Sequence, residues 1–212
     1  MAQVLKEEVR QRILDAGLEV FAREGYASAT MAHIARAAGL STGNIYRYFA
    51  TKEALFAAVL PDSFVAGFTH VVRGRALAAR GLADVGAIAG SDAHQAVTQA
   101  LVDLVTTHRL RVVILLGRAE GTPHAGYAEE LVGTMVRLAL AHARELVPGL
   151  EVGDGLRFDL RLVYRNLLGS LVAVLVHYRD PGRIAAALAR YSRYHLAGLE
   201  ALFRGGGSPS DG

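Results

Sequence analysis

Cysteine is absent from this chain of 212 residues. Its absence excludes disulfide bonds, cysteine-based zinc sites and thiol nucleophiles, and it fits a reducing cytoplasm. Long uncharged runs are also missing. The longest stretch without Asp, Glu, Lys or Arg extends only from Asn166 to Tyr178, whereas a membrane-spanning helix needs about 20 apolar residues. The N-terminal segment MAQVLKEEVRQRI is charged and amphipathic, unlike a signal peptide. We therefore expect a cytoplasmic protein without a membrane partner.

Patterns typical of catalytic and metal sites are scarce as well. The eight His residues never recur three or four positions apart, so no helix presents a paired-histidine metal site, and the HExxH motif is missing. Glu120 and His124 form a near pair, but Gly121 and Pro123 place it in a loop, and no nucleophile stands beside it. We expect no metal, no cofactor and no enzymatic activity.

Strand patterns are the last notable absence. Alternating runs of Val, Ile and Thr bounded by turns are missing, and Ala, Leu, Arg and Glu dominate, so we expect an all-α chain. Its length and 52% hydrophobic content suit a small domain of about 50 residues followed by a larger one. The C-terminal GGGSPSDG is typical of a disordered tail. The expected divisions are 1–50, 51–204 and 205–212.

What the sequence does contain is most specific between residues 25 and 56, which read as two short helices joined by a tight turn. The first would begin at Thr30, a capping residue, and end at Gly39, which suits the left-handed conformation that closes a helix. Ser41 would cap a second helix, from Thr42 to about Tyr48, whose outer face is polar and lacks carboxylates. This is the outline of a helix-turn-helix DNA reader.

The distribution of charge supports a nucleic-acid surface more than the net charge of +3 does. No Asp or Glu stands between Glu24 and Glu53, while Arg36, Arg47 and Lys52 do, so nothing in this segment repels a phosphate backbone. A surface that lacks carboxylates by chance is the alternative. The coincidence of the charge gap with the helix-turn-helix spacing favours DNA.

The segment from Arg12 to Val59, RILDAGLEVFAREGYASATMAHIARAAGLSTGNIYRYFATKEALFAAV, resembles the N-terminal pattern of the TetR-type transcriptional regulators. One departure is His33, where an acidic residue reaching back to the helix cap is more usual. The residues that fall where the pattern expects them are Ile13, Ala16, Phe21, Gly25, Tyr26, Thr30, Ile34, Ala35, Gly39, Ser41, Gly43, Tyr46, Phe49, Lys52, Glu53 and Leu55.

The resemblance implies an N-terminal three-helix DNA-binding domain followed by a larger helical ligand-binding and dimerisation domain. It places a recognition helix in the major groove, where Asn44 could pair with adenine and Arg47 could read a guanine or clamp a phosphate. Tyr46 could instead be a core aromatic, and Thr30 or Ser41 a plain cap. The expected DNA-binding residues are Thr30, Ser41, Thr42, Gly43, Asn44, Tyr46, Arg47, Tyr48 and Lys52.

Beyond Val59 the sequence predicts further helices, with a break or kink at Pro61. The segment from Asn166 to Val176 is apolar nearly all round and contains small residues, so a partner should cover it. An internal helix pair in a monomer is the alternative, but the resemblance favours a homodimer on a palindromic operator. The expected dimer residues are Leu168, Gly169, Val172, Ala173, Val176, Ile184, Leu188, Tyr191, His195 and Leu199. The helices are expected at about 51–60, 62–80, 92–107, 110–118, 124–146, 154–179 and 181–203.

The resemblance also implies a small-molecule effector pocket with an apolar wall and few polar groups. Arg165 and Asn166 are the strongest candidates, because polar residues on an otherwise apolar helix need a partner or a ligand. The expected ligand-binding residues are His108, Arg118, Glu120, His124, Tyr127, His142, Arg165, Asn166 and His177. Ligand binding would shift the helix between Thr51 and Leu60 and release double-stranded DNA.

The sequence therefore predicts a ligand-responsive DNA-binding regulator, most simply a repressor. Two other classes stay open at this point. A nonspecific architectural DNA-binding protein would need no ligand, although it would leave the larger part of the chain unexplained. A helical enzyme fits least, for the reasons given above.

Overall fold

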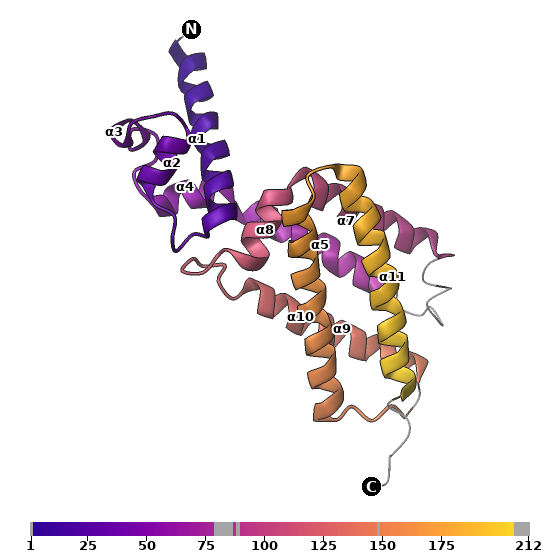
Figure 1. Ribbon diagram of the computed structural model, residues 1–212. Helices are drawn as coiled ribbons and strands as arrows, with labels where there is room; N and C mark the ends of the chain where they lie inside the picture. The colour runs from indigo at the N-terminus through magenta and orange to yellow at the C-terminus, as the bar shows by residue number, and fades with distance from the viewer. Residues whose placement is uncertain (1, 79–86, 88–89, 148, 206–212) are drawn as a thin grey trace. The chain divides into compact units, whose positions relative to one another are not determined.

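The computed structural model describes residues 2–78, 87, 90–147 and 149–205. Within these ranges the chain is helical and contains no strand, which confirms the all-α class (Figure 1). The helices are α1 (Ala2–Glu24), α2 (Met31–Ala37), α3 (Thr42–Ile45), α4 (Lys52–Val59), α5 (Asp62–Ala78), α7 (Asp92–Thr107), α8 (Arg109–Gly117), α9 (Tyr127–Leu146), α10 (Asp154–His177) and α11 (Pro181–Gly205).

These bounds agree with the expected helices to within a few residues, with two differences. The helix expected from His124 begins at Tyr127, because residues 119–126 form turns around Gly121, which has a φ of 83°. Gly205, assigned to the tail, is the last residue of α11. The rest of the expected tail, residues 206–212, lies outside the described residues.

The chain forms two compact units that do not follow a simple N-terminal to C-terminal division. The first unit comprises residues 1–67 and 108–127, and the second comprises residues 68–107 and 128–212. The first unit is thus larger than the expected domain of residues 1–50, because α4 and α8 pack with α1.

In the first unit, α1 supplies the central apolar stripe. Its buried residues recur at helical spacing, with Ile13, Val20 and Phe21 fully buried. α4 packs beside Gly17, where a Cβ would lie 3.4 Å from Val59 and 3.5 Å from Leu55, within ordinary van der Waals contact. α2 and α8 also pack on α1. This core holds the short helices α2 and α3 in place.

The break at Pro61 occurs as predicted. α4 ends at Val59, and Leu60 adopts φ −124° and ψ 76°, a non-helical conformation, which agrees with the steric exclusion of a residue before proline from the helical region. Arg111 of α8 donates from Nε to the backbone oxygen of Val59 at 2.8 Å. The C-terminal end of α4 is therefore bonded to α8 within the same unit.

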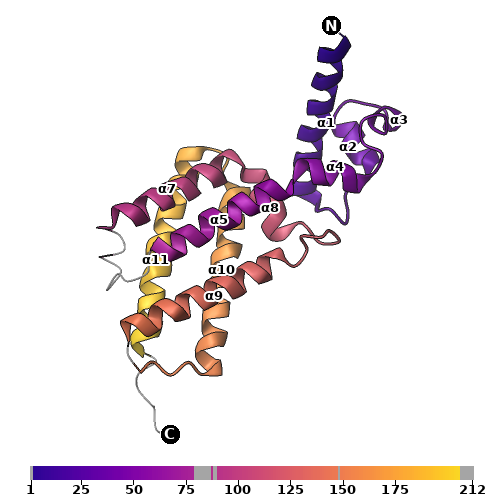
Figure 2. The same ribbon diagram turned by 180° about the vertical axis from the view of Figure 1, so that it is seen from behind.

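The second unit is a helical bundle in which α10 and α11 run side by side, as both views show (Figures 1 and 2). α7 also packs against α11. Leu160, Leu175 and Ile184 are among its fully buried side chains.

Two helical stretches, Lys52–Ala78 and Asp154–His177, are long and apolar enough to cross a membrane by length and composition alone. Packed helices of soluble helical proteins have the same properties. The first stretch is interrupted at Pro61, and the second carries Arg161 and Arg165 along its length. Charged groups within such a stretch are costly in the centre of a bilayer.

Candidate DNA interface and internal cavity

The turn between α2 and α3 is closed by Gly39, as the sequence predicts. Gly39 has a φ of 66°, a left-handed conformation that costs other residues about 1–2 kcal/mol. The Leu40 N–H donates to the Ala35 oxygen at 2.9 Å, and the Gly39 N–H donates to the Arg36 oxygen at 3.1 Å. This pair of bonds is the Schellman arrangement, which satisfies the last carbonyls of α2.

A side chain from α1 stabilises the same turn. Arg12 donates from Nη2 to the backbone oxygen of Ala38 at 2.6 Å. A charged donor strengthens a hydrogen bond to a carbonyl, so α1 holds the end of α2 directly. Arg12 begins the motif segment, but its role depends on a residue 26 positions away, and the sequence alone did not indicate it.

Three hydroxyl residues cap the helices around the turn. The side-chain oxygen of Thr30 accepts from the His33 N–H at 3.2 Å, and that of Ser41 accepts from the Asn44 N–H at 3.2 Å. Thr51 caps α4 in the same way, accepting from the Ala54 N–H at 3.1 Å. Thr30, Ser41 and Thr51 are all exposed, so each hydroxyl can still donate to an acceptor outside the chain.

The expected recognition helix is shorter than predicted. α3 ends at Ile45, and residues 46–48 form a turn instead of a continuing helix. The Arg47 N–H donates to the Asn44 oxygen at 3.2 Å and the Tyr48 N–H donates to the Ile45 oxygen at 3.0 Å. Bonds between residues three apart tighten the backbone beyond α-helical geometry, which is common at helix ends.

The outer side of this short element is open and carries no carboxylate. Thr42, Gly43, Tyr46 and Arg47 are exposed, and Tyr46 is 49% exposed despite its aromatic ring. Gly43 lies inside a helix, has no positive φ, and a Cβ added to it would meet nothing within 4 Å. Neither backbone conformation nor packing within the chain calls for glycine there. A glycine at this position would allow the backbone of another molecule to approach α3 closely.

Two residues of the expected DNA surface, Asn44 and Tyr48, are partly buried. Their neighbours in the chain, Ile45 and Phe49, belong to the core. The Arg10 guanidinium lies 5.5 Å from the centre of the Phe49 ring.

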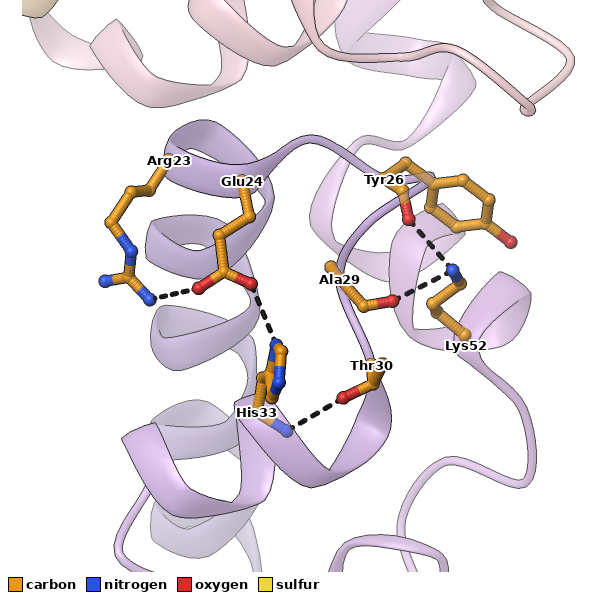
Figure 3. A network of polar contacts seen from close by, with 7 residues as sticks. All are labelled: Arg23, Glu24, Tyr26, Ala29, Thr30, His33 and Lys52. Carbon is orange, nitrogen blue, oxygen red and sulfur yellow. Dashed lines mark hydrogen bonds and ion pairs between the residues drawn. The ribbon is translucent and has the colours of Figure 1, made fainter.

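Lys52 has a different environment from the one expected of a phosphate-binding residue. Its Nζ donates to the backbone oxygens of Tyr26 at 2.8 Å and Ala29 at 3.0 Å, and it lies 4.2 Å from the Tyr26 ring centre (Figure 3). The side chain is partly buried. Two of its three donors therefore tie the loop after α1 to the start of α4. Helical spacing could not reveal these bonds, because the acceptors are carbonyls of a distant loop.

His33, the departure from the usual capping pattern, bonds to α1 instead. Its Nδ1 lies 2.9 Å from Oε2 of Glu24, whose Oε1 accepts from Arg23 Nη2 at 2.6 Å (Figure 3). Hydrogen bonds from Arg23 and then His33 lower the pKa of the Glu24 carboxyl below its usual value. The reciprocal bond of a capping box is thus replaced by a link between α2 and α1.

Three aromatic rings join the loop, α1 and α4. Tyr26 and Phe56 meet edge to face with centres 4.9 Å apart, and Phe21 and Phe56 meet likewise at 5.3 Å. The Tyr26 hydroxyl donates to Glu53 Oε1 at 2.9 Å. Burial, followed by this bond, raises the pKa of Tyr26 to about 12. The aromatic residue that follows Gly25 in the motif therefore serves the fold of the first unit.

The second unit contains a cavity of about 460 Å³. Its wall is mainly apolar, and its residues come from α5, α7, α9, α10 and α11. They are Phe68, Val72, Arg75, Ala76, Thr98, Gln99, Leu101, Val102, Val105, Met135, Leu167, Leu168, Ser170, Leu171, Ala185, Ala186, Leu188, Ala189, Tyr191, Ser192 and His195. An apolar enclosure of about 300–1,000 Å³ with few polar groups is typical of a small-molecule site.

None of the nine expected ligand-binding residues lines this cavity, so the structure does not support that set for this site. His108, Arg118, Glu120, His124 and Tyr127 belong to the first unit, and His142, Arg165, Asn166 and His177 to the second. Several of these nine residues bond to other side chains or face solvent.

Arg165 was a leading candidate, and its partner is a carboxylate. Its Nε and Nη2 donate to Glu129 at 2.9 and 2.7 Å, and both side chains are exposed. His108 Nδ1 lies 3.2 Å from Arg111 Nη1. Burial and, after it, the positive charge of Arg111 lower the pKa of His108. His124 Nε2 lies 3.4 Å from Asp62. Glu120, Asn166 and His177 are exposed.

The expected dimer residues divide into two groups. Leu168, Ile184 and His195 are buried within the unit itself, so their side chains contribute to its core. Leu168, Leu188, Tyr191 and His195 also line the cavity. A stripe at intervals of three and four residues cannot tell a core face from an interface. Gly169, Ala173, Val176 and Tyr191 are exposed, and Val172, Leu188 and Leu199 are partly exposed.

An exposed apolar face on α10 and α11 extends beyond the expected residues. Phe158, Leu162 and Val176 of α10 are 64%, 48% and 55% exposed, and Tyr194 of α11 is 78% exposed. Phe158, Leu162, Gly169, Ala173 and Val176 follow one side of α10. Large exposed apolar side chains grouped in this way mark an interaction surface. Phe158, Leu162 and Tyr194 are not among the expected dimer residues. Phe158 and Leu162 precede the apolar segment that begins at Asn166, and Tyr194 lies outside the apolar stripe of α11.

Sequence comparison with known proteins finds matches to the N-terminal segment. The profile of the family described as "Bacterial regulatory proteins, tetR family" matches residues 13–59. The HTH-type transcriptional regulator SrpR of Pseudomonas putida is 50% identical over 54 residues, which are 26% of this chain and 25% of that protein. The HTH-type transcriptional regulator AcrR of Shigella flexneri is 42% identical over 53 residues, 25% of each chain. The matched segment therefore spans about a quarter of the length of these two relatives.

A solved structure of a TetR-like transcriptional regulator from Rhodococcus sp. RHA1 aligns with 93% of this chain and 94% of that chain. Its sequence identity is 21% and its TM-score is 0.49.

Proposed function

Because residues 13–59 belong to the tetR family of bacterial regulatory proteins, we propose that the whole protein is a ligand-responsive transcriptional repressor that binds a palindromic DNA operator. The observation that most supports this proposal is the exposed outer side of α3 and of the turn that follows it, which carries no carboxylate. It combines an exposed Arg47, an exposed Tyr46 and a glycine, Gly43, that nothing inside the chain requires. A major groove admits a short helix, and a helix without carboxylates on its outer side suits the phosphate backbone.

Within this proposal the contacts have two kinds. Thr42, Asn44 and Arg47 would meet base edges, since they lie along the start and outer side of the element. Thr30, Ser41, Tyr46 and Tyr48 would bond to the sugar-phosphate backbone through hydroxyl groups. Lys52 is assigned to the fold of the reader, because two backbone carbonyls already engage its ammonium group.

The proposed active form is a homodimer. The exposed apolar face of α10 and α11, with Phe158 and Tyr194 at its most open positions, is the surface offered to the second copy. A twofold protein presents two readers to the two halves of a palindrome. We place the dimer in the cytoplasm, with no role for a membrane.

The proposed effector site is the cavity of the second unit. α5 contributes Phe68, Val72 and Arg75 to its wall and begins at Asp62, three residues after α4 ends at Val59. A ligand that shifts α5 would therefore act on a helix that begins in the first unit and is joined to α4 by two residues. Release requires that the ligand bind the DNA-free form more tightly, and the coupling is reciprocal.

Fluorescence polarisation tests the DNA-binding proposal. The purified protein is titrated into labelled duplex from the region upstream of its own gene, with a scrambled duplex of the same composition, at one fixed salt concentration. Specific binding predicts at least about a thousandfold preference for the true sequence. Equal affinity for both duplexes would favour a nonspecific architectural protein over a repressor for that region.

A further inference from the structure

Arg75 is the one permanently charged residue among the described residues that line the cavity. It lies on α5, is partly buried and points its guanidinium toward hydroxyl groups of two other helices. Nε lies 3.2 Å from Thr98 Oγ1, and Nη2 lies 2.6 Å from Ser192 Oγ. Neutral hydroxyls orient a guanidinium but do not neutralise its charge.

The other described residues that line the cavity around Arg75 are neutral, and none of them is an acid. His195, also in the wall, is buried, and burial followed by the charge of Arg75 lowers its pKa to about 4. The same two causes, in the same order, lower the pKa of the buried His94. Both imidazoles are thus held neutral at pH 7. Burial also lowers the pKa of Arg75 itself.

A positive charge withdrawn from water without a counter-charge is unfavourable. Two of the five N–H donors of Arg75 are bonded to the hydroxyls described above, which leaves donors for another acceptor. A carboxylate matches this demand, because it supplies the missing charge and two oxygens for the planar guanidinium.

The rest of the wall defines the other end of the ligand. Phe68, Val72, Val105, Met135 and Leu168 are buried apolar residues of the wall, contributed by four helices. They offer an apolar body a surface away from water, which stabilises binding in proportion to the area covered. A fully polar anion would gain nothing from them.

We propose that this cavity binds an amphipathic organic carboxylate, whose anionic head pairs with Arg75 and whose apolar body lies against the hydrophobic wall. The inference rests on the proposed function for its regulatory meaning, since it names the chemical class of the effector. The binding site itself does not depend on that function. Lining groups with a role near the head are Thr98, Ser192 and His195.

Isothermal titration calorimetry on the full-length protein without DNA tests this proposal. The probes are decanoate, decanol and decylamine, which share one chain length and differ in the charge of the head. We expect decanoate to bind about tenfold or more tightly than decanol, and decylamine to bind most weakly. Arg75→Met is expected to remove the preference for decanoate over decanol, whereas Arg75→Lys retains part of it.

Arg73→Met is the matched control, because Arg73 is exposed on the same helix and does not line the cavity. It removes the same charge and should leave the preference intact. If Arg75→Met fails to fold, as judged by circular dichroism, the comparison of the three probes on the unchanged protein still decides. The proposal is overturned if decanoate and decanol bind with equal affinity. It is also overturned if no probe binds, as would happen if a second copy of the chain filled the cavity.

A second arm separates this inference from the proposed function. Decanoate is added to the protein bound to its operator duplex. Release of the DNA on addition of decanoate supports both the carboxylate site and the proposed repressor function. Selective binding of decanoate without release supports the carboxylate site and contradicts its role as the effector site. If no operator is bound at all, the repressor proposal fails, and calorimetry alone judges the cavity.

Discussion

Lys52 Nζ donates a hydrogen bond to the backbone oxygen of Tyr26 at 2.8 Å, across 26 positions of sequence. The same nitrogen also donates a hydrogen bond to the backbone oxygen of Ala29 at 3.0 Å. The lysine of the motif therefore secures the loop between α1 and α2 to the start of α4.

This arrangement predicts that Lys52→Met destabilises the protein without removing a phosphate contact. Loss of two bonds from a charged donor to partly buried carbonyls should lower the free energy of unfolding by about 2 kcal/mol. The slope of log affinity against log salt should stay the same. Urea unfolding and polarisation titrations at several salt concentrations measure the two quantities. A slope reduced by about 0.9 would instead indicate a Lys52–phosphate contact.

Arg47→Ala should weaken operator binding and leave stability unchanged, because the side chain is exposed. If Arg47 binds a phosphate, affinity falls for every duplex and the salt slope decreases by about 0.9. If it reads a guanine, discrimination at one base pair falls by about 1–3 kcal/mol. Titrations against the operator and single-base variants distinguish the two.

The control for this experiment is Arg73→Ala, which removes one exposed arginine from α5 and keeps the net charge equal to that of the Arg47 variant. Equal loss of affinity in both variants would mean that total charge, not a contact at α3, governs binding.

The apolar face of α10 and α11 predicts a dimer that a charge would disrupt. In the double variant Val176→Asp/Tyr194→Asp, two carboxylates would have to be buried without partners, so the chain should become monomeric at micromolar concentration. Light scattering coupled to size-exclusion chromatography reports the mass. Leu77→Asp places a carboxylate at a comparably exposed apolar site, 44% exposed on α5, and should leave the dimer intact. A double variant that stays dimeric would place the interface elsewhere.

His195 predicts loss of stability on mild acidification. Its folded-state pKa is lowered to about 4 from 6.5, so the unfolded chain binds more protons between these values. Stability must therefore rise with pH through this window and fall as pH decreases from about 6.5 toward 4. Between pH 8 and pH 5 the contribution of His195 to the free energy of unfolding should decrease by about 2 kcal/mol. His94, whose pKa is also lowered, acts in the same direction.

Urea unfolding at fixed protein concentration, repeated from pH 8 to pH 5, measures this effect. His195→Gln cannot acquire the charge and should show a clearly flatter profile. His70→Gln is the control, since His70 is exposed. Profiles of equal steepness for His195→Gln and the unchanged protein would show that His195 already titrates normally in the folded state.

Much of the fold could be read from the sequence because its signals are local. Gly39, Ser41 and Pro61 act on the backbone of their immediate neighbours, and the turn, the cap and the helix break occur where these residues predict them. Ile13 and Ile34, which fall where the family pattern expects them, are fully buried in the first unit. The shortening of α3 was missed, because bonds between residues three apart do not change the side-chain pattern enough to be seen.

The sequence by itself determined the helical class, the position of the turn between α2 and α3 and the resemblance of residues 13–59 to the tetR family, because each depends on contacts between neighbours in the chain. Only the tertiary structure decided which polar groups have partners. It joined Lys52 to Tyr26, Arg165 to Glu129 and Arg75 to Ser192, the last pair 117 positions apart. Such pairings depend on how helices pack side by side, and helical spacing specifies a face without specifying what lies against it.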